Sequence, residues 1–463
     1  MLINLANSNI DRMENTQPRY KTVSLFSGGM GLDVGMKLVD RFDLLLCVEK
    51  VPAFCETIRA NQASGALPGT LKIIEADIKT LDPERIRSEM GLKPGELDVL
   101  VGGPPCQSFS TAGKRGTVQD PRGTLLWDYL RFVEAFQPKF FLMENVRGLL
   151  SAALNHRQIK LRPEKGGEEL SESELPGSVI KLFCEDLNRL TGASYHMDCF
   201  EVNSVNYGAP QIRERAIFIG NRFNAIVDFP NPTHGHSRQE DGTFAETLFE
   251  EPPLHPWRTL RDAIGNLNEL EPVVLDFSPR KKFFLDLVPP GANWRSLPEE
   301  IQQESMGAAW HAKGGRSGWW RRLTMDLPCP TLVTMPNHAS TSLCHPTETR
   351  ALSLGEYARI QEFPDDWKFC GTTAEKYAQV GNAVPVRLGK VAGEIIAKNL
   401  DILREQGWQP FAKPVERLRK VYVQSHVRTR NWFKNGEMCV WTEDGEAPAY
   451  TAPKTIRRVS TLK

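Results

Sequence analysis

Residues 22–31 read TVSLFSGGMG, an apolar run that passes directly into a glycine-rich turn. The first five residues of this run predict a short buried strand, and helical spacing follows as far as Met36. A second apolar run over residues 42–48 ends at Glu49. A strand, a glycine turn, a helix and another strand in this order predict the first unit of a parallel α/β sheet.

The same alternation continues along the chain. Strands are expected at residues 71–75, 97–101 and 139–143, and helices at 53–61 and 124–136. The fold class predicted is α/β with a doubly wound, mostly parallel sheet, in which ligands bind at the carboxyl ends of the strands. The polar or reactive residues that follow these strands are Glu49, Asp77, Cys106 and Glu144.

Composition divides the chain into domains. After residue 221 Pro, Gly, Trp and Arg become frequent and periodic segments stop, until a long helix is expected at 384–400. The tail is locally basic, as a DNA-facing or a solvated segment would be. The expected parts are a first domain at 1–220 with a polar surface insertion at 151–177, an irregular smaller domain at 221–350, a return segment at 351–403 that completes the first domain, and a basic extension at 404–463.

The overall composition excludes several classes of protein. The 463 residues include 57 Lys and Arg and 57 Asp and Glu, so a globally basic nucleic-acid binder is excluded, although a local basic face is not. No apolar run approaches the roughly 20 residues of a membrane helix, and the polar start lacks the apolar core of a signal peptide. The nine Cys have no CxxC spacing, which argues against a metal site or a disulfide framework and favours a reducing cytoplasm.

The first candidate site lies around the glycine turn. Glu49, one strand after Gly28, is placed to accept hydrogen bonds from the ribose hydroxyls of an adenosyl group. Asp33 would repel a pyrophosphate but suits a cationic ligand such as S-adenosylmethionine, and a charge that satisfies the helix dipole explains it equally well. Asp77 and Ile78 fit either an adenine site or a turn cap.

The second candidate site begins at residues 102–110, which read GGPPCQSFS. Two glycines allow a tight turn and two prolines stiffen it, so Cys106 would be presented at the ligand edge of the sheet. A buried structural thiol is the alternative, but the position at a strand end favours a nucleophile. Glu144 follows apolar neighbours, which should raise the pKa of its carboxyl and let it donate a hydrogen bond; a cap or an ion pair is the alternative.

Two arginines and an asparagine complete the candidates. Arg213 and Arg215 face the same side if this segment is extended, so they can hold an oxygen acceptor and lower the pKa of a nearby thiol. A solvated strand edge explains them without function. Asn382 precedes the last long helix and, by itself, is explained as a turn cap.

Taken together, these motifs resemble those of the DNA cytosine-5 methyltransferases of bacterial restriction–modification systems. The resemblance covers roughly residues 21–400, apart from the insertion and the variable stretch after residue 221. Met30 departs from the family pattern, which more often has Gly, and is expected to crowd the methionine end of the cofactor. The matching motifs are Phe26-Ser-Gly28 with Gly31, Glu49, Asp77-Ile78, Gly103-Pro-Pro-Cys106-Gln, Asp120-Pro-Arg122-Gly-Thr-Leu125, Glu144-Asn-Val146, Gln211-x-Arg213-x-Arg215, Arg359-Ile-Gln-Glu-Phe-Pro364 and Gln379-Val-Gly-Asn382-Ala-Val384-Pro.

The resemblance implies a Rossmann-like methyltransferase that uses S-adenosyl-L-methionine to methylate double-stranded DNA. A monomer without a metal, acting beside a possible restriction endonuclease for the same site, is expected. In this family Cys106 would attack C6 of a flipped cytosine, Glu144 would hold N3, and Arg213 and Arg215 would orient the base. The residues implied to bind the cofactor are Phe26, Gly28, Gly31, Glu49, Asp77, Ile78, Pro105, Leu125, Asn382 and Val384.

DNA contacts are implied in two places. A loop after the Cys106 motif would close on the DNA through Gln107, Ser110, Lys114 and Arg115. The region 221–350 corresponds to the target-recognition domain of the family, and its arginines suit guanine edges or phosphates. The best candidates there are Arg316, Arg321 and Arg322. The tryptophan pair at 319–320 is interpreted as core of the smaller domain.

Two other functions share some of these features. An RNA cytosine methyltransferase would use the same scaffold, but the long variable region favours readout of duplex DNA. A catalytically inactive DNA-binding regulator would have no need for a complete set of catalytic residues. The presence of Cys106, Glu144, Arg213 and Arg215 together argues against it.

Overall fold

A computed structural model describes most of the chain. The described residues are 17–105, 124–235, 254–311, 318–407, 410, 418–424, 433–434, 437–438 and 456–462. Cys106, Gln107, Ser110, Lys114, Arg115 and Arg316 lie outside them.

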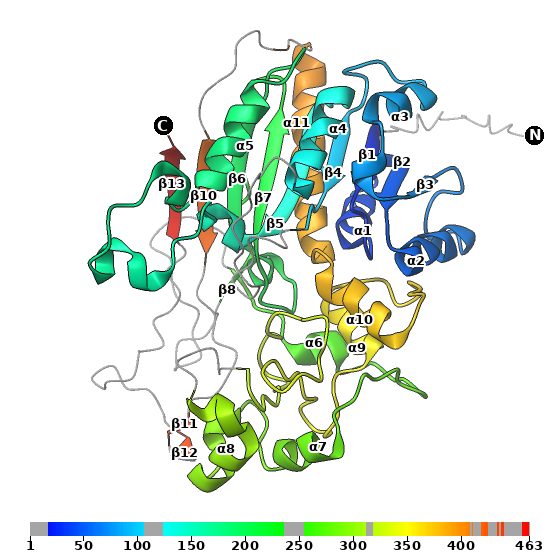
Figure 1. The fold of residues 1–463 in the computed structure, drawn as a ribbon. Coiled ribbons are helices and arrows are strands. Elements are labelled where there is room, and N and C mark those ends of the chain that lie inside the picture. The colour runs from blue at the N-terminus through cyan, green and yellow to red at the C-terminus, as the bar shows by residue number, and fades with distance from the viewer. Residues whose placement is uncertain are drawn as a thin grey trace, which may run out of the picture.

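A nine-stranded sheet forms the centre of the protein, with strand order β13-β10-β6-β7-β5-β4-β1-β2-β3 (Figure 1). Strands β1 to β5 pair in parallel, whereas β7 is antiparallel to both of its neighbours. The doubly wound, mostly parallel sheet predicted from the sequence is therefore confirmed. The strands are β1 (Tyr20–Leu25), β2 (Phe42–Glu49), β3 (Lys72–Glu75), β4 (Val99–Gly102), β5 (Phe140–Val146), β6 (His196–Asn203), β7 (Glu214–Asn221), β10 (Leu418–Gln424) and β13 (Ile456–Leu462).

Helices cover both faces of the sheet. Side chains alternate across a strand, so Leu100 of β4 packs into a core with helices α4 and α5, while Val99 and Val101 pack into the opposite core with α11. Figure 1 shows α11 on the other side of the strands from α4 and α5. The helices of this domain are α1 (Gly31–Lys37), α2 (Pro52–Ala63), α3 (Pro83–Glu89), α4 (Leu125–Phe136), α5 (Ser178–Asn188) and α11 (Val386–Gln406).

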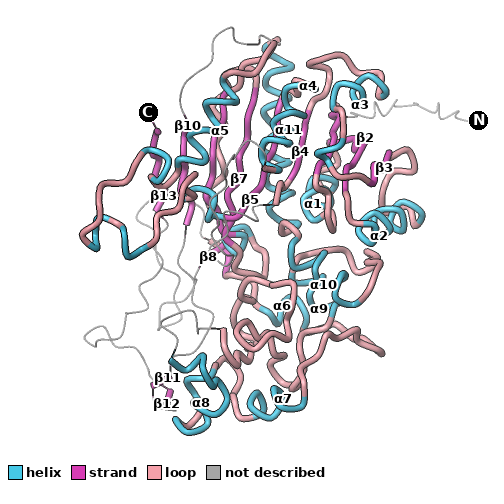
Figure 2. The backbone as a smooth tube through the Cα atoms, in the orientation of Figure 1, coloured by secondary structure: helices cyan, strands magenta, loops and turns pink. Residues whose placement is uncertain are grey.

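The smaller domain lies below the carboxyl ends of the strands and consists mostly of loops (Figure 2). Its own core contains Phe284, Trp294 and Trp320, and Trp320 is 1% exposed, which confirms the core assignment of that tryptophan. The elements in this part of Figure 1 are β8 (His234–Gly235), β9 (His255–Pro256), α6 (Leu260–Ile264), α7 (Pro279–Asp286), α8 (Glu299–Met306), α9 (Leu354–Ile360), α10 (Thr373–Asn382), β11 (Phe433–Lys434) and β12 (Glu437–Met438). Of these, α9 and α10 belong to the return segment 351–403 and share a core with Met30 and Val34 of the first domain, and β11 and β12 belong to the extension.

The last part of the chain differs from the sequence expectation. Helix α11 begins after Pro385 and continues to Gln406, six residues beyond its expected end at 400. Strand β10 then pairs in parallel with β6, and β13 pairs with β10, so the extension adds two strands to the sheet. Val421 is fully buried in the core beneath α11. Strands β10 and β13 of the extension are therefore part of the central sheet rather than a solvated or DNA-facing tail, whereas β11 and β12 form a separate two-stranded sheet.

Among the described residues, no helix is both long enough and apolar enough to cross a membrane.

Candidate active site

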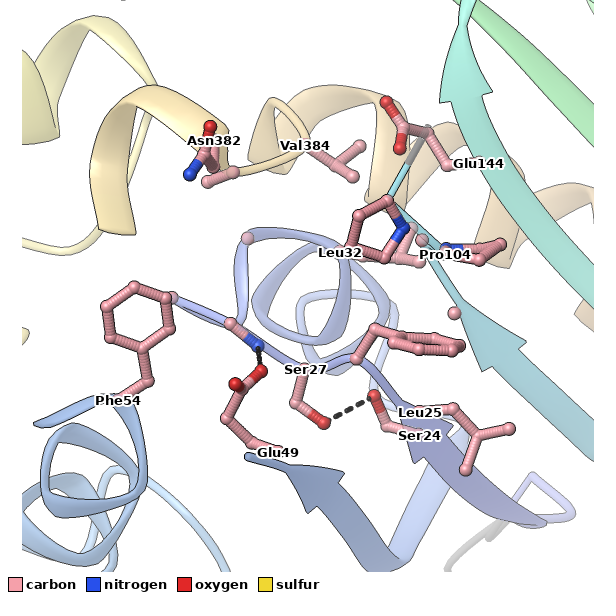
Figure 3. A pocket seen from close by; sticks show the side chains of 18 of the residues that line it. Ser24, Leu25, Ser27, Leu32, Glu49, Phe54, Pro104, Glu144, Asn382 and Val384 are labelled. Carbon is pink, nitrogen blue, oxygen red and sulfur yellow. Dashed lines mark hydrogen bonds between the residues drawn. The ribbon is translucent and has the colours of Figure 1, made fainter. Parts of the chain in front are cut away.

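A cavity of about 600 Å³ opens at the carboxyl ends of β1, β2, β4 and β5 (Figure 3). This volume lies within the range of roughly 300–1,000 Å³ that is typical of sites for small molecules. The sheet brings the two candidate sites of the sequence together, because Glu144, Arg213 and Arg215 line the same cavity as the predicted cofactor residues. All ten of those predicted residues line it: Phe26, Gly28, Gly31, Glu49, Asp77, Ile78, Pro105, Leu125, Asn382 and Val384.

The glycine turn between β1 and α1 is tightly wound. Gly28 has a φ of 53°, and a Cβ on Gly31 would lie 2.2 Å from the carbonyl oxygen of Val384, so only glycine allows this approach. Met30 adopts a φ of 65°, and its side chain is fully buried in a core with Val34. The expectation that Met30 crowds the cofactor is therefore wrong, because the left-handed turn directs its side chain into the core.

Glu49 connects the end of β2 to the glycine turn. One carboxylate oxygen accepts the N–H of Gly28 at 2.8 Å, and the other accepts the N–H groups of Lys50 and Val51 at 2.9 Å. Figure 3 shows Glu49 at the wall of the cavity, with a dashed line for its hydrogen bond to the glycine turn. The carboxylate is thus fixed before any ligand binds, and each oxygen keeps acceptor capacity for a hydroxyl group.

The two further acids near the turn are in different environments. Burial raises the pKa of Asp33 to about 7, against a hydrogen bond from Ser24, so it is not an exposed charge at a helix end. Asp77 accepts the N–H of Lys79 at 3.1 Å, which lowers its pKa, and it lies 3.5 Å from the ammonium of Lys50. Asp77 therefore caps its turn and also lines the cavity, so the two interpretations of this residue are compatible.

The segment that leads to Cys106 is held from the neighbouring strand. Asn145 donates a hydrogen bond from Nδ2 to the carbonyl oxygen of Pro104 at 2.9 Å, and Pro105 lines the cavity. The glycine turn and β5 thus flank the point where the chain continues to Cys106.

Glu144 lies inside β5, two residues before the end of that strand, and faces the cavity (Figure 3). Its Oε1 is 2.6 Å from Nε of Arg215, and both side chains are about nine-tenths buried. Because β7 runs antiparallel to β5, the first residues of β7 reach the carboxyl edge of the sheet, where Arg215 pairs with Val146. Glu144 therefore forms an ion pair, which was the alternative considered for it in the sequence analysis. Its surroundings include the charged Arg215 as well as apolar groups.

Arg213 differs from Arg215 in its contacts. Its guanidinium donates to the carbonyl oxygens of Leu332 at 2.9 Å and Gly381 at 2.7 Å, and the residue is 2% exposed. Burial lowers the pKa of both arginines, and Glu144 opposes this effect. The expectation that both arginines orient a base therefore needs correction: the two terminal nitrogens of Arg213 are bound to backbone carbonyls of distant segments.

The DNA-binding candidates of the smaller domain that the structure describes are Arg321 and Arg322. Arg322 is 7% exposed and donates to the carbonyl oxygen of Leu285 at 2.8 Å and to Oγ1 of Thr349 at 2.7 Å. This burial contradicts a DNA contact by Arg322, which is a structural residue of the domain. Arg321 is half-buried and donates to the carbonyl oxygen of Ser342 at 3.2 Å.

Several residues of the cavity wall were not selected as site residues from the sequence. Phe54, on α2, belongs to none of the matching motifs. Asn145 and Gln379 belong to matching motifs, but no role was assigned to them. The additional lining residues include Lys50, Val51, Phe54, Asn145 and Gln379. Within the described ranges, no group of three or more His, Cys, Asp or Glu side chains can hold a metal ion.

The fold and the cavity define a class of protein: an α/β enzyme with a ligand site at the carboxyl edge of its sheet. Comparison with known proteins identifies the family. Residues 20–398 match the family described as C-5 cytosine-specific DNA methylase, and the chain belongs to this family. The protein is a DNA (cytosine-5-)-methyltransferase, EC 2.1.1.37.

Individual relatives agree with this assignment. The chain is 34% identical over 385 residues to the type II methyltransferase M.Sau96I of Staphylococcus aureus, covering 82% of this chain and 76% of that protein. It is 35% identical over 389 residues to the type II methyltransferase M.PspPI of Psychrobacter sp. (strain TA137), covering 82% and 80%. A crystal structure of a putative DNA modification methyltransferase encoded within a prophage of E. coli covers 83% of this chain and 99% of that chain, with a TM-score of 0.50 and 23% identity, and supports the fold.

Proposed function

We propose that this protein methylates C5 of cytosine within a specific double-stranded DNA sequence, with S-adenosyl-L-methionine as methyl donor. We also propose that it is the modification half of a restriction–modification system, in which an endonuclease recognises the same site. One observation carries the proposal: a single cavity is lined by the predicted cofactor residues and by Glu144 and Arg215.

The cavity residues fit the cofactor. The fixed carboxylate of Glu49 suits the two ribose hydroxyls, and Asp77 and Ile78 suit the amino group and the face of the adenine. The methionine part would lie along the turn at Gly28 and Gly31. When bound, the cofactor supplies the methyl group as an electrophile.

Replacing Glu49 with alanine should weaken cofactor binding. The ribose would lose its acceptors and the Gly28 N–H its partner, which should cost on the order of 1.5–3 kcal/mol of binding free energy. Calorimetric titration with S-adenosylhomocysteine measures this loss. Glu56→Ala on α2, whose carboxylate pairs with Arg59 on the surface, is the matched control. Equal dissociation constants for wild type and Glu49→Ala would remove Glu49 from the cofactor site.

The proposed reaction takes place on a cytosine flipped out of the duplex. The Cys106 thiolate attacks C6, while Glu144 holds N3 and shares its proton, so that negative charge does not accumulate on the ring. C5 then accepts the methyl group. Removal of the C5 proton restores the ring and expels Cys106 as a thiolate. Arg215 holds Glu144 in place and lines the same cavity, and it is proposed to bind the base oxygen.

Sequence recognition is proposed to lie in residues 221–350. The pocket receives only a cytosine, which is the same in every site, so the neighbouring bases must be read elsewhere. With Arg322 buried, Arg316 and Arg321 remain the candidates from its basic segment. The loop residues Gln107, Ser110, Lys114 and Arg115 are proposed to contact the DNA around the flipped base.

Exchanging residues 221–350 for the same region of another family member should transfer the methylated sequence to the hybrid enzyme. Within the native protein, Ala at Arg316 or Arg321 should cost roughly 1–3 kcal/mol and relax one position of the site if the arginine reads a guanine. A phosphate contact would instead weaken all sequences alike. Methylation of a randomised duplex library at fixed salt distinguishes these results. A hybrid that keeps the original site would show that recognition lies elsewhere.

Mapping 5-methylcytosine in the DNA of cells that express the protein tests the function as a whole. We expect methylation at one short sequence motif. A parallel assay with duplex DNA and tRNA as substrates separates the DNA enzyme from an RNA methyltransferase. Methylation of neither substrate would favour a catalytically inactive DNA-binding regulator.

A further inference from the structure

A buried polar cluster joins four segments that are separate in the chain. It consists of Gln211, Arg213 and Gln361, which are 0%, 2% and 0% exposed. We call these three residues the amide junction. The segments that they join are the residues just before β7, the end of α9, the stretch around Leu332 in the smaller domain, and the end of α10.

The two glutamines bind each other and the backbone on either side. Nε2 of Gln211 donates to Oε1 of Gln361 at 2.9 Å, and Oε1 of Gln211 accepts the N–H of Leu332 at 3.0 Å. Nε2 of Gln361 donates to the carbonyl oxygens of Val380 at 2.7 Å and Ala383 at 3.1 Å. A movement of one segment relative to the other would break buried hydrogen bonds, which makes the connection stiff.

Arg213 and Gly381 reinforce the same connection. Arg213 bridges the carbonyl oxygens of Leu332 and Gly381. A Cβ on Gly381 would lie 2.6 Å from the carbonyl oxygen of Val333, so the end of α10 and the smaller domain touch backbone to backbone. No side chain can be added at this contact without separation of the two segments.

The other side of the same turn faces the cavity. Asn382, Ala383 and Val384 line the cavity, and the glycine turn packs against Val384 through Gly31. Figure 3 shows Asn382 and Val384 on the wall opposite Glu49. The turn at 379–384 is therefore held between the proposed cofactor site and the domain proposed to read DNA.

We propose that the amide junction couples cofactor binding to the position of the recognition domain, with Gln211 and Gln361 as positioning residues. This inference rests on the proposed function. A ligand that restricts the motion of the turn at 379–384 also restricts the carbonyl groups of Val380 and Ala383. Because Gln361 binds these carbonyls and Gln211 binds both Gln361 and Leu332, the motion of Leu332 is restricted as well. By linkage, the cofactor and DNA then strengthen each other's binding by the same factor.

Hydrogen exchange tests this directly in the full-length protein. Adding S-adenosylhomocysteine should slow exchange in residues 329–334 of the wild type, although Leu332 and Val333 are not among the described residues that line the cavity. In Gln361→Met, which keeps the length of the side chain but loses both donated bonds, we expect protection around Glu49 and loss of protection at 329–334.

A binding experiment provides the functional measurement. The affinity for S-adenosylhomocysteine is measured with and without saturating sheared duplex genomic DNA. We expect the wild type to bind at least about fivefold tighter with DNA, and Gln361→Met to show a ratio near one. Tyr195→Phe, which removes a buried hydrogen bond to Pro138 away from the junction, should keep the wild-type ratio.

Gly381→Ala provides a second variant in case Gln361→Met folds poorly. It forces the two backbones apart without removal of a hydrogen-bonding group, and we expect the same loss of coupling. The inference would be overturned if DNA did not change the affinity of the wild type for S-adenosylhomocysteine. It would also be overturned if both variants folded and DNA strengthened their binding as much as in the wild type. Neither result would affect the proposed methyl transfer. Absence of protection around Glu49 in the wild type would instead contradict the cofactor site and the coupling together.

Discussion

Replacing Cys106 with serine should lower the rate of methyl transfer by more than about a thousandfold and leave cofactor binding nearly unchanged. A serine hydroxyl forms far less of its anion at neutral pH than a thiol, and the attack on C6 requires the anion. Transfer of a labelled methyl group to duplex DNA measures the rate, and calorimetry with S-adenosylhomocysteine measures binding.

A second thiol serves as the control for this change. Cys184 is half-buried on α5, on the face of the sheet covered by α4 and α5, and Cys184→Ser should keep full activity. If Cys106→Ser retained turnover close to that of the wild type, the covalent mechanism would be wrong. Pro105 lines the cavity and Asn145 holds Pro104, so the described chain before Cys106 ends at the wall of the cavity where the base is proposed to bind.

Replacing Glu144 with alanine should affect both turnover and stability. Turnover should fall by about 10²–10⁴-fold, because N3 of the base loses its hydrogen-bonding acid. The free energy of unfolding should fall by about 3–5 kcal/mol, because Arg215 keeps a buried charge without its carboxylate partner at 2.6 Å. Steady-state kinetics and chemical denaturation measure the two effects separately.

Two further variants separate catalysis from structure. Glu144→Gln keeps the size of the side chain, so it should lose turnover with a smaller loss of stability. Glu362→Gln removes a carboxylate that pairs with Arg258 and Arg387, and should lower stability with little effect on turnover. Turnover by Glu144→Gln equal to that of the wild type would assign Glu144 a structural role alone.

Much of the site was predictable because this fold brings residues from the ends of successive strands close together. Parallel strands end at the same edge of a sheet, so residues that follow successive strands, such as Glu49 and Asp77, lie around one cavity. Glycines in a turn between a strand and a helix indicate a close approach of another backbone, and Gly31 indeed lies against Val384. The expected helix at 384–400 also returns to this cavity, through Val384 and the neighbouring Asn382.

The sequence by itself thus determined the α/β class and placed Glu49, Asp77 and Glu144 at one edge of the sheet, because local periodicity and strand ends specify both. The resemblance to the family added the lining residues that no strand end indicates, such as Leu125 and Asn382. Only the tertiary structure decided which partner each long side chain meets. The alternation of Arg213 and Arg215 placed them on one strand, yet Arg215 meets Glu144 while Arg213 meets carbonyls 119 and 168 residues further along the chain. Arg322 is buried for the same reason, since a guanidinium binds whichever acceptors the packed segments bring within reach.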